Sequence, residues 1–412
     1  MKFRKSGQVV LASVVSLGVA TGVTACGVSN TVDFVFVTNS KANPGQINVY
    51  YADSQSGALT QIPESPYPSG GRNPVAEVTS PNGKNLYVIN HDDNTIVQFA
   101  IGTDAKLYAG HTYNTPGTEP NSVAIGSQGN YLFVTDTYQP GFTPANPGSG
   151  ALVVYPINSD GSLGSPVTNG TLAYWPLNNE TSIIVNPTSV TVLANGASVY
   201  VVNQSPTTGL GSISAFNVGS GGALTPVYCS GSSATCETDG TYLSGTAPSA
   251  IASDPTNRFL YVTDSFTNQL ISFTVQSTGA IVASQNGPTR TDVFPKAVTV
   301  DPRGLYVYVA NYTGNDISAY TINQSTGYPT GVAAAGTYGT GAGPSCVLVE
   351  PALGRYVYTA NFLDNTVSGF NLNPNTGTLT TTQNAPYIAA GQPTCAAAVP
   401  HGNHSTQNVP SY

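Results

Sequence analysis

The chain alternates between short apolar runs and polar turns, and one arrangement of them recurs. In "YVYVANYTGNDISAYTI" (306–322), an apolar run ends at Asn311, small polar residues follow, and a second apolar run begins. Runs of this length that are rich in Val and Tyr and bounded by Gly, Asn, Asp and Ser are typical of β-strands. The pattern therefore predicts two strands joined by a polar turn.

Equivalent pairs of runs occur along the whole chain. The first run of each pair ends at Asn or Asp, in "FVFVTN" (Asn39), "LYVIN" (Asn90), "LFVTD" (Asp136), "VYVVN" (Asn203), "LYVTD" (Asp264), "VYVAN" (Asn311) and "VYTAN" (Asn361). These capping residues are 51, 46, 67, 61, 47 and 50 residues apart. Short third runs often begin at a glycine, as in "GALTQI" (57–62). A unit of this length with four strands has the size of one blade of a β-propeller.

The remaining strand of each unit begins at a proline. In a propeller this would be the inner strand, which lines the central channel. These strands are expected in "NPVAEVTSP" (73–81), "EPNSVAIGS" (119–127), "NPTSVTVLA" (186–194), "APSAIASDP" (247–255), "FPKAVTVDP" (294–302), "GPSCVLVEP" (343–351) and "QPTCAAAVP" (392–400). The last of them has no strand pair behind it, so it is expected to join the three strands of 33–62. We predict an all-β fold over 33–400, a seven-bladed β-propeller closed by strands from both termini, which removes the open sheet edge.

The repeated unit resembles that of a known family. The pattern xPxxV…P-x-G/N-x-[FLY]-[LV]-Y-V-x-[ND], as in "APSAIASDPTNRFLYVTD", is similar to the seven-bladed propeller lactonases over about 33–400. That family includes bacterial 6-phosphogluconolactonases and fungal muconate-lactonising enzymes of the muconate-cycloisomerase type. The resemblance implies hydrolysis of a lactone ring at the channel mouth. Family members commonly carry a histidine directly after the inner-strand proline, and this sequence has no "PH" in any blade. A non-catalytic propeller that binds a carbohydrate, a small ligand or a protein is therefore the alternative.

Candidate catalytic residues are sought at the channel entrance. The residue after each inner-strand proline is predicted to lie there: Val75, Asn121, Thr188, Ser249, Lys296, Ser345 and Thr394. Lys296 is charged, and the two-residue period of a strand places Glu77 on the same face as Val75. A lactonase needs a base to activate water and a cation to stabilise the anionic intermediate. His91, in the turn "INHDDNT", would supply an imidazole, and Arg72 would supply a further cation. The four candidates are His91, Glu77, Arg72 and Lys296. A salt link, a solvated turn histidine and a surface arginine are the alternatives.

Candidate ligand-binding residues differ between the repeats. Asn121 lies at the predicted entrance, and Arg290 precedes the fifth inner strand. Tyr174 and Trp175 lie in the insertion 165–187, where an exposed aromatic pair would stack on a sugar or on a partner. Covering a hydrophobic blade edge is the alternative for this pair.

The N-terminus carries an export signal. Residues 1–25 combine a basic start with a mostly apolar stretch, and "VTAC" (23–26) resembles the bacterial lipobox, which implies lipidation of Cys26. The alternative is an ordinary signal peptide that contains a cysteine. We expect a tether over 26–32, a polar tail over 401–412, and an exported monomer anchored to a membrane of the bacterial cell envelope or periplasm.

The other cysteines and the charge refine this prediction. Cys229 and Cys236 flank a polar loop and are expected to form a disulfide, as is usual outside the cytosol. Cys346 and Cys395 occupy equivalent positions in neighbouring blades, so their side chains are expected to point the same way around the ring rather than at each other. Charged residues make up 8% of the chain and the formal net charge is −8, which argues against nucleic-acid binding. No motif indicates a cofactor or a metal.

Overall fold

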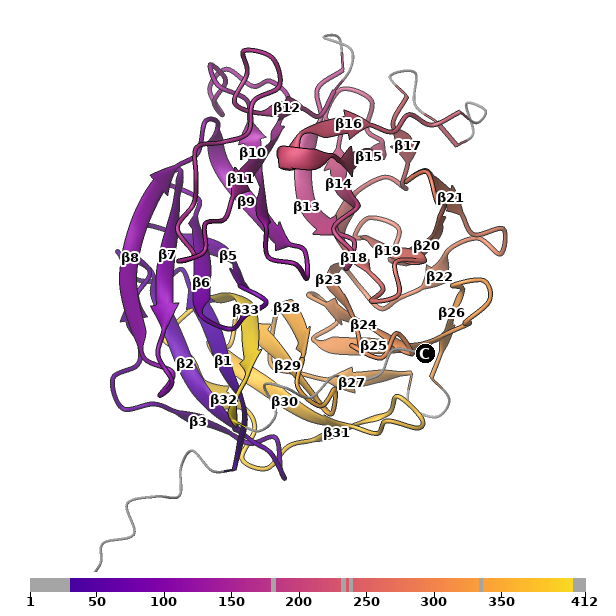
Figure 1. Cartoon of the computed structure of the whole chain (residues 1–412). Helices are drawn as coiled ribbons and strands as arrows, with labels where there is room; N and C mark the ends of the chain where they lie inside the picture. Colours follow the sequence, from indigo (N-terminus) through magenta and orange to yellow (C-terminus); the bar gives the residue numbers. More distant parts are fainter. Residues whose placement is uncertain (1–29, 179–182, 231–234, 237–239, 333–335, 403–412) are drawn as a thin grey trace, which may run out of the picture.

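The computed structural model describes residues 30–178, 183–230, 235–236, 240–332 and 336–402, and folds them into seven sheets arranged as a ring (Figure 1). The described residues are almost entirely β-strand and turn, with one short 3-10 helix, η1 (Ser220–Gly222). The prediction of an all-β, seven-bladed propeller is therefore confirmed. The sheets are numbered here as blades 1 to 7 in chain order.

Blade 1 combines both ends of the ring, and blades 2 and 3 are continuous along the chain. Blade 1 contains β1 (Thr31–Asn39), β2 (Gln46–Asp53), β3 (Leu59–Gln61), β4 (Tyr67–Pro68) and β33 (Pro393–Pro400). Blade 2 contains β5 (Pro74–Thr79), β6 (Asn85–Asn90), β7 (Thr95–Ile101) and β8 (Leu107–Asn114). Blade 3 contains β9 (Thr118–Ile125), β10 (Tyr131–Tyr138), β11 (Ala151–Pro156) and β12 (Trp175–Pro176).

Blades 4 to 7 each have four strands and a short fifth one. Blade 4 contains β13 (Asn186–Val192), β14 (Ser198–Gln204), β15 (Gly211–Val218), β16 (Leu224–Pro226) and β17 (Tyr242–Leu243). Blade 5 contains β18 (Pro248–Ser253), β19 (Phe259–Asp264), β20 (Gln269–Val275), β21 (Ile281–Ala283) and β22 (Thr289–Arg290). Blade 6 contains β23 (Pro295–Val300), β24 (Tyr306–Asn311), β25 (Asp316–Ile322), β26 (Pro329–Gly331) and β27 (Thr337–Gly339). Blade 7 contains β28 (Pro344–Val349), β29 (Tyr356–Asn361), β30 (Thr366–Leu372), β31 (Leu379–Thr381) and β32 (Tyr387–Ile388).

The ring closes between its two chain ends. The yellow strand β33 lies beside the indigo strand β1 (Figure 1) and pairs with it antiparallel, with Phe34 opposite Val399 and Phe36 opposite Ala397. The predicted pairing of 392–400 with the first strands is thus confirmed. This pairing satisfies the backbone groups of β1, whose inner edge would otherwise be open.

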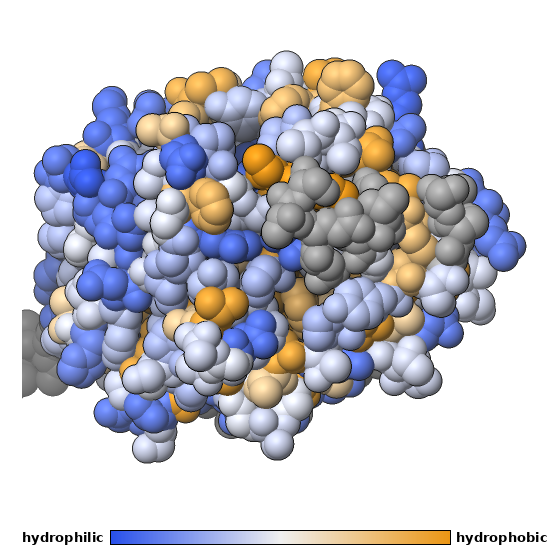
Figure 2. All heavy atoms as spheres, turned by 90° about the horizontal axis from the view of Figure 1, so that it is seen from above, coloured by the Kyte–Doolittle hydropathy of each residue, from blue (hydrophilic) through white to orange (hydrophobic). Residues whose placement is uncertain are grey.

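Buried apolar side chains pack between neighbouring blades. Between blades 1 and 2, Phe36 and Val49 pack in one buried cluster with Leu86 and Val88. Ala397 and Val399 of the inner strand β33 belong to the same cluster, so this strand also serves the contact between blades. In the side view over blades 3 and 4 (Figure 2), apolar and polar residues are mixed on the outer surface.

A tyrosine on the second strand of five blades links each of them to the next blade. Its buried hydroxyl donates to the carbonyl oxygen of a glycine with positive φ in a turn of the next blade. The pairs are Tyr87–Gly161 (2.7 Å), Tyr200–Gly279 (2.9 Å), Tyr261–Gly327 (2.9 Å), Tyr308–Gly377 (2.9 Å) and Tyr358–Gly57 (2.8 Å). The equivalent residues of blades 1 and 3 are Phe36 and Phe133, which have no hydroxyl. The Tyr in the repeated "YV" of the sequence thus serves the contact between blades.

An asparagine in the turn after the second strand forms another link in four blades. Its left-handed backbone places Oδ1 next to the backbone N–H of the residue before the proline of the following blade. The pairs are Asn94–Glu119 (2.7 Å), Asn268–Phe294 (2.7 Å), Asn315–Gly343 (2.9 Å) and Asn365–Gln392 (2.7 Å). Asn tolerates this backbone conformation better than most residues.

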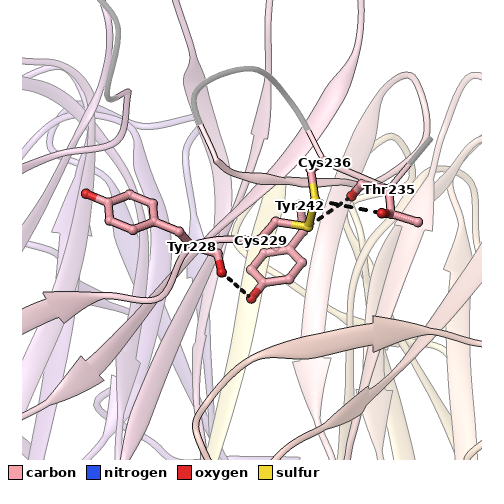
Figure 3. The surroundings of a disulfide bond; sticks show 5 residues. All are labelled: Tyr228, Cys229, Thr235, Cys236 and Tyr242. Atoms are coloured by element: carbon pink, nitrogen blue, oxygen red, sulfur yellow. Dashed lines mark hydrogen bonds between the residues drawn. A yellow bond between two sulfur atoms is a disulfide. The ribbon is translucent and has the colours of Figure 1, made fainter. Parts of the chain in front are cut away.

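The disulfide lies on blade 4, between β16 and β17. Cys229 and Cys236, the pair expected from the sequence, are joined with an S–S distance of 2.02 Å (Figure 3). The hydroxyl of Tyr242 donates to the carbonyl oxygen of Tyr228 next to it, at 3.4 Å.

The leader 1–25, Cys26 and most of the tail 401–412 lie outside the described residues. Among the described residues, no helix is long and apolar enough to cross a membrane.

Candidate functional site

The channel mouth is formed where the seven inner strands begin. Each inner strand has a β-bulge directly after its proline. In β23, for example, Pro295 pairs with Asn311 and Ala297 pairs with Ala310, so Lys296 is the extra residue of the bulge. A cavity of about 710 Å³ lies at this mouth, and all seven predicted entrance residues line it: Val75, Asn121, Thr188, Ser249, Lys296, Ser345 and Thr394.

Five of the seven entrance residues form a chain of hydrogen bonds around the mouth. Each donates from its side chain to the carbonyl oxygen of the inner-strand proline of the next blade. The pairs are Asn121–Pro187 (2.5 Å), Thr188–Pro248 (2.8 Å), Ser249–Pro295 (2.6 Å), Ser345–Pro393 (2.9 Å) and Thr394–Pro74 (2.7 Å). These side chains therefore hold the inner strands together, which is a structural role.

Val75 and Lys296 interrupt this chain of hydrogen bonds. Val75 has no polar group, and the ammonium of Lys296 has no hydrogen bond or ion pair with any other described residue. The side chain of Lys296 is exposed to the cavity. The surrounding wall nevertheless excludes enough water from its ammonium group to lower the pKa of the amine. Among the described residues that line the cavity, Lys296 alone carries a charge. It is thus available to a ligand that brings an anionic or carbonyl oxygen.

Three aromatic side chains line the cavity near the start of blades 6 and 7. Phe294 directly precedes Pro295, and Tyr312 and Phe362 directly follow the capping residues Asn311 and Asn361. Sequence reasoning missed these residues. The signal was present, because the residue after the cap is polar in the other five blades and aromatic in these two. Together with Lys296, the rings form a wall that is apolar except for one cation.

Glu77 does not line the cavity, contrary to our prediction. The bulge between Pro74 and Ala76 adds one residue to β5, so a two-residue period counted from Val75 fails. Glu77 is 6% exposed and lies between blades 2 and 1, where Oε1 accepts a hydrogen bond from the backbone N–H of Thr38 at 3.3 Å. Burial, and then the nearby thiol of Cys395, raise the pKa of Glu77 well above its usual range.

His91 and Arg72 lie together at the rim of blade 2 and do not line the cavity. Nδ1 of His91 lies 2.8 Å from an Asp92 oxygen, and Nε2 lies 3.8 Å from a carboxylate oxygen of Glu119. Nε of Arg72 donates to Asp93 at 2.7 Å, and its NH2 donates to the carbonyl oxygen of Asp92 at 3.0 Å. The structure therefore brings His91 and Arg72 into one polar cluster, apart from Lys296 and Glu77. Their proposed catalytic roles stay predictions.

The candidate ligand-binding residues are also separated. Asn121 lines the cavity, with its amide engaged by Thr137 and Pro187 and its carbonyl by Thr135. Arg290 is exposed on the outer strand β22 and is not part of the cavity wall.

Trp175 is not exposed, which corrects our expectation for the 165–187 insertion. It is 3% exposed on the outer strand β12, packs with Leu152 and Phe216, and donates through Nε1 to the carbonyl oxygen of Leu224 at 3.2 Å. Tyr174 beside it is partly buried against the cluster between blades 2 and 3. The insertion thus covers the hydrophobic edge of blade 3, which was the alternative interpretation.

The cavity wall also holds two thiols that face each other. Cys346 and Cys395 line the cavity, and their sulfur atoms are 3.3 Å apart. The expectation that the two side chains point the same way around the ring is wrong. The inner strands converge so closely at the mouth that equivalent positions of adjacent blades come into contact.

Other parts of the described chain offer less chemistry. A cavity of about 330 Å³ lies on the opposite face, between blades 3 and 4, and is lined by turn residues such as Gln128 and Asn195 with no charged side chain among them. Within the described residues, no cluster of three or more His, Cys, Asp or Glu side chains has an arrangement suited to a metal ion.

Comparisons with known proteins agree with the geometry of the ring. Residues 34–174 and 229–349 match the family described as "Lactonase, 7-bladed beta-propeller". A Bacteroides fragilis protein provisionally assigned as a 6-phosphogluconolactonase is 19% identical with a TM-score of 0.70, and the match covers 91% of this chain and 100% of that one. The periplasmic gluconolactonase of Pseudomonas aeruginosa is 17% identical with a TM-score of 0.70, over 90% of this chain and 99% of that one. At these identities the likeness shows a shared fold. No curated protein matches the sequence.

Proposed function

Since the chain belongs to the seven-bladed β-propeller lactonase family, we propose that it binds a lactone at the channel mouth and opens the ring by hydrolysis. The observation that carries the proposal is Lys296, a cation without a protein partner among the described residues, in the wall of a cavity of about 710 Å³. A volume of this size is typical of sites for small ligands.

The proposed role of Lys296 follows from the chemistry of ester hydrolysis. Water adds to the lactone carbonyl, the carbonyl oxygen gains negative charge, and the ring oxygen then leaves. A cation placed at that oxygen stabilises the charge as it develops, and it acts most strongly where water is partly excluded. The aromatic rings of Phe294, Tyr312 and Phe362 would pack against the C–H face of the lactone ring.

A panel of lactones tests this proposal. The panel would contain glucono-δ-lactone, its 6-phosphate and an unsubstituted δ-lactone, each corrected for hydrolysis in buffer. We expect turnover by the wild type, and a loss of about 100-fold in kcat/KM for Lys296→Met, the size typical of removing one oxyanion-stabilising group. Lys84→Met, in an exposed turn of blade 2, is the matched control. Unchanged kcat/KM in Lys296→Met would overturn the assignment of Lys296.

The same panel tests the other candidate residues. His91 and Arg72 lie outside the cavity wall, so His91→Ala and Arg72→Ala are expected to leave kcat/KM close to the wild-type value. A loss comparable to that of Lys296→Met in either variant would restore that residue to the catalytic set.

Non-catalytic binding of an anionic ligand is the second candidate. The observation that favours it is the absence of carboxylate and imidazole groups among the described residues that line the cavity, since such groups are the usual bases in hydrolysis. Calorimetry with gluconate and glucono-δ-lactone separates the two candidates. Binding that requires Lys296 without any turnover would support the binding function and exclude hydrolysis of these lactones.

We also propose that the protein is exported and held at a membrane through lipidated Cys26. The disulfide Cys229–Cys236 supports this, because such bonds persist in oxidising compartments. Metabolic labelling with a fatty-acid analogue in a bacterial host is the test. We expect label in the wild type and none in Cys26→Ser, and equal labelling of the two would contradict the anchor.

A further inference from the structure

The channel wall contains a pair of thiols from two different blades. Cys346 belongs to β28 of blade 7 and Cys395 to β33 of blade 1, and they are 49 positions apart in the sequence. Their sulfur atoms are 3.3 Å apart, and the backbone N–H of Ala396 donates to the sulfur of Cys346 at 3.2 Å. A disulfide bond has an S–S distance of about 2.0 Å, so bond formation needs an approach of about 1.3 Å.

The two strands are held in register at this point. The hydroxyl of Ser345, the residue before Cys346, donates to the carbonyl oxygen of Pro393 at 2.9 Å and to that of Thr394 at 3.2 Å. Both acceptors immediately precede Cys395 in the sequence. The thiols are therefore brought together by the same hydrogen bonds that close the mouth between blades 7 and 1.

This position is specific to these two blades. In the other five blades the second residue after the proline is small and has no sulfur: Ala76, Ser122, Ser189, Ala250 and Ala297. A small filler would satisfy packing at all seven positions, so packing alone does not account for cysteine at the two that are in contact. Both thiols also line the 710 Å³ cavity, which gives a small reagent access to them.

We infer that Cys346 and Cys395 are a modification site at which a disulfide forms between blades 7 and 1, closing the ring covalently at its seam. The oxidant is a disulfide R–S–S–R, either small or on a protein. The thiolate of one cysteine attacks it, forms a mixed disulfide and releases RS⁻. The thiolate of the second cysteine then attacks the protein sulfur of the mixed disulfide and releases a second RS⁻. The two protons of the thiols pass to the two RS⁻ groups, so that two RSH form for each bond.

The order of attack follows from the surroundings of the two sulfurs. The neighbouring thiol of Cys346, together with burial, raises the pKa of the Cys395 thiol well above its usual range. The backbone N–H of Ala396, 3.2 Å from the sulfur of Cys346, stabilises negative charge on that sulfur, so we expect Cys346 to attack first.

The bond would stabilise the strand on which ring closure depends. β33 is the last strand of the ring, and its pairing with β1 joins the two ends of the chain. A disulfide between two cysteines 49 positions apart restricts the unfolded chain strongly, because the loss of conformational freedom grows with the number of residues that the bond encloses.

The test exposes the purified full chain to oxidised glutathione or to dithiothreitol, blocks free thiols with iodoacetamide, and maps peptides without reduction. After oxidised glutathione we expect a linked pair of peptides that contain Cys346 and Cys395, lighter than the two free peptides by two hydrogen atoms. Dithiothreitol should remove this link. Iodoacetamide adducts on both cysteines after oxidised glutathione would overturn the inference, and so would glutathione adducts that never resolve to the linked pair.

Melting temperatures of a variant without the Cys229–Cys236 disulfide test the Cys346–Cys395 bond independently of peptide mapping. In Cys229→Ser/Cys236→Ser, only the seam pair of the ring can be oxidised, and we expect the oxidised form to melt about 5 °C above the reduced form. Adding Cys346→Ser should remove that difference, because no second thiol remains to complete the bond. Equal melting temperatures of the oxidised and reduced forms in the first background would contradict the covalent closure.

Discussion

The hydroxyl of Tyr308 on blade 6 donates a 2.9 Å hydrogen bond to the carbonyl oxygen of Gly377 on blade 7, and both groups are buried. Gly377 adopts a φ of 71°, and a side chain on it would collide with Tyr306, so the carbonyl is held where the tyrosine reaches it. Four other blades repeat this link with their own tyrosine and glycine. The contact between blades therefore combines apolar packing with one fixed polar bond.

Tyr308→Phe is expected to lower the free energy of unfolding by about 1–2 kcal/mol, because the carbonyl of Gly377 loses its partner inside the protein. Urea unfolding followed by fluorescence measures the change. Tyr108→Phe, at a tyrosine that is 56% exposed, is the control and should leave the midpoint unchanged. If both variants unfold at the wild-type urea concentration, the hydrogen bond does not contribute to stability.

Two substitutions of Asn315 separate its side-chain bond from its backbone conformation. Asn315 has a φ of 57° and accepts a hydrogen bond from the N–H of Gly343 at 2.9 Å. Asn315→Gly keeps the backbone conformation accessible and should destabilise by about 1 kcal/mol through the lost bond. Asn315→Ala should destabilise by about 1 kcal/mol more, because a side chain with Cβ disfavours this conformation.

Thermal or urea unfolding of both variants measures the difference, with Asn375→Ala, at an exposed residue of blade 7, as the control. Equal destabilisation by Gly and Ala would show that the positive φ has no energetic consequence at this turn.

These links show why the ring could be predicted from the sequence while much of the site could not. The strand pattern, the caps and the circular phase are local signals that repeat, so "VYVAN" identifies β24 without knowledge of its neighbours. Contacts between blades depend on how closely the strands converge. The repeat correctly placed Lys296 at the entrance, whereas the bulge after Pro74 moved Glu77 out of the cavity wall.

The same limit explains the remaining differences. Cys346 and Cys395 meet because adjacent inner strands are close at the mouth, and sequence positions carry no information about that distance. Trp175 is buried because its insertion returns to form β12 at the edge of blade 3, a contact between segments that the local sequence does not indicate.

Asp136→Asn is expected to stabilise the protein at neutral and alkaline pH. Burial raises the pKa of Asp136 to about 7, whereas its value in the unfolded chain is about 3.9. The folded state therefore holds the proton more strongly, and the stability linked to it is present below about pH 4 and lost as the pH rises through about 7. Asparagine carries no charge and can still accept the hydrogen bond that the N–H of Gly117 donates to Asp136 at 2.9 Å. The equivalent residue of blade 4 is already an asparagine, Asn203.

At pH 8 the variant should have a free energy of unfolding about 1–3 kcal/mol above that of the wild type. This is less than the full free energy that corresponds to the pKa difference between the folded and unfolded states. At pH 4 the two should unfold within about 0.5 kcal/mol of each other. Denaturant unfolding at the two pH values is the measurement. A stability difference that does not depend on pH would show that Asp136 is already charged in the folded state.

Asp33 and Glu350 are two buried carboxyl groups that interact at the seam of the ring. Both carboxyl groups are fully buried, and Asp33 lies opposite Pro400 in the pairing of β1 with β33. Burial, and then repulsion by Glu350, raise the pKa of Asp33 well above its usual range. If both groups were ionised, neither could donate a hydrogen bond to the other. The carboxylate oxygens of Asp33 have no hydrogen-bond donor from any other described residue. We therefore predict that the pair shares a proton, which would supply the missing bond.

Asp33→Asn should therefore make ring closure less dependent on pH. Because the folded-state pKa of Asp33 lies above the unfolded value, the stability that it contributes is present below about pH 4 and is lost as the pH rises through the folded-state pKa. The amide of asparagine donates to Glu350 at any pH, so the variant should gain in melting temperature over the wild type as the pH is raised from 4 to 8. Glu64→Gln, at a half-exposed surface carboxylate paired with Lys106, is the control and should follow the wild-type profile. A difference in melting temperature between Asp33→Asn and the wild type that is the same at pH 4 and pH 8 would show that the pair is not sharing a proton.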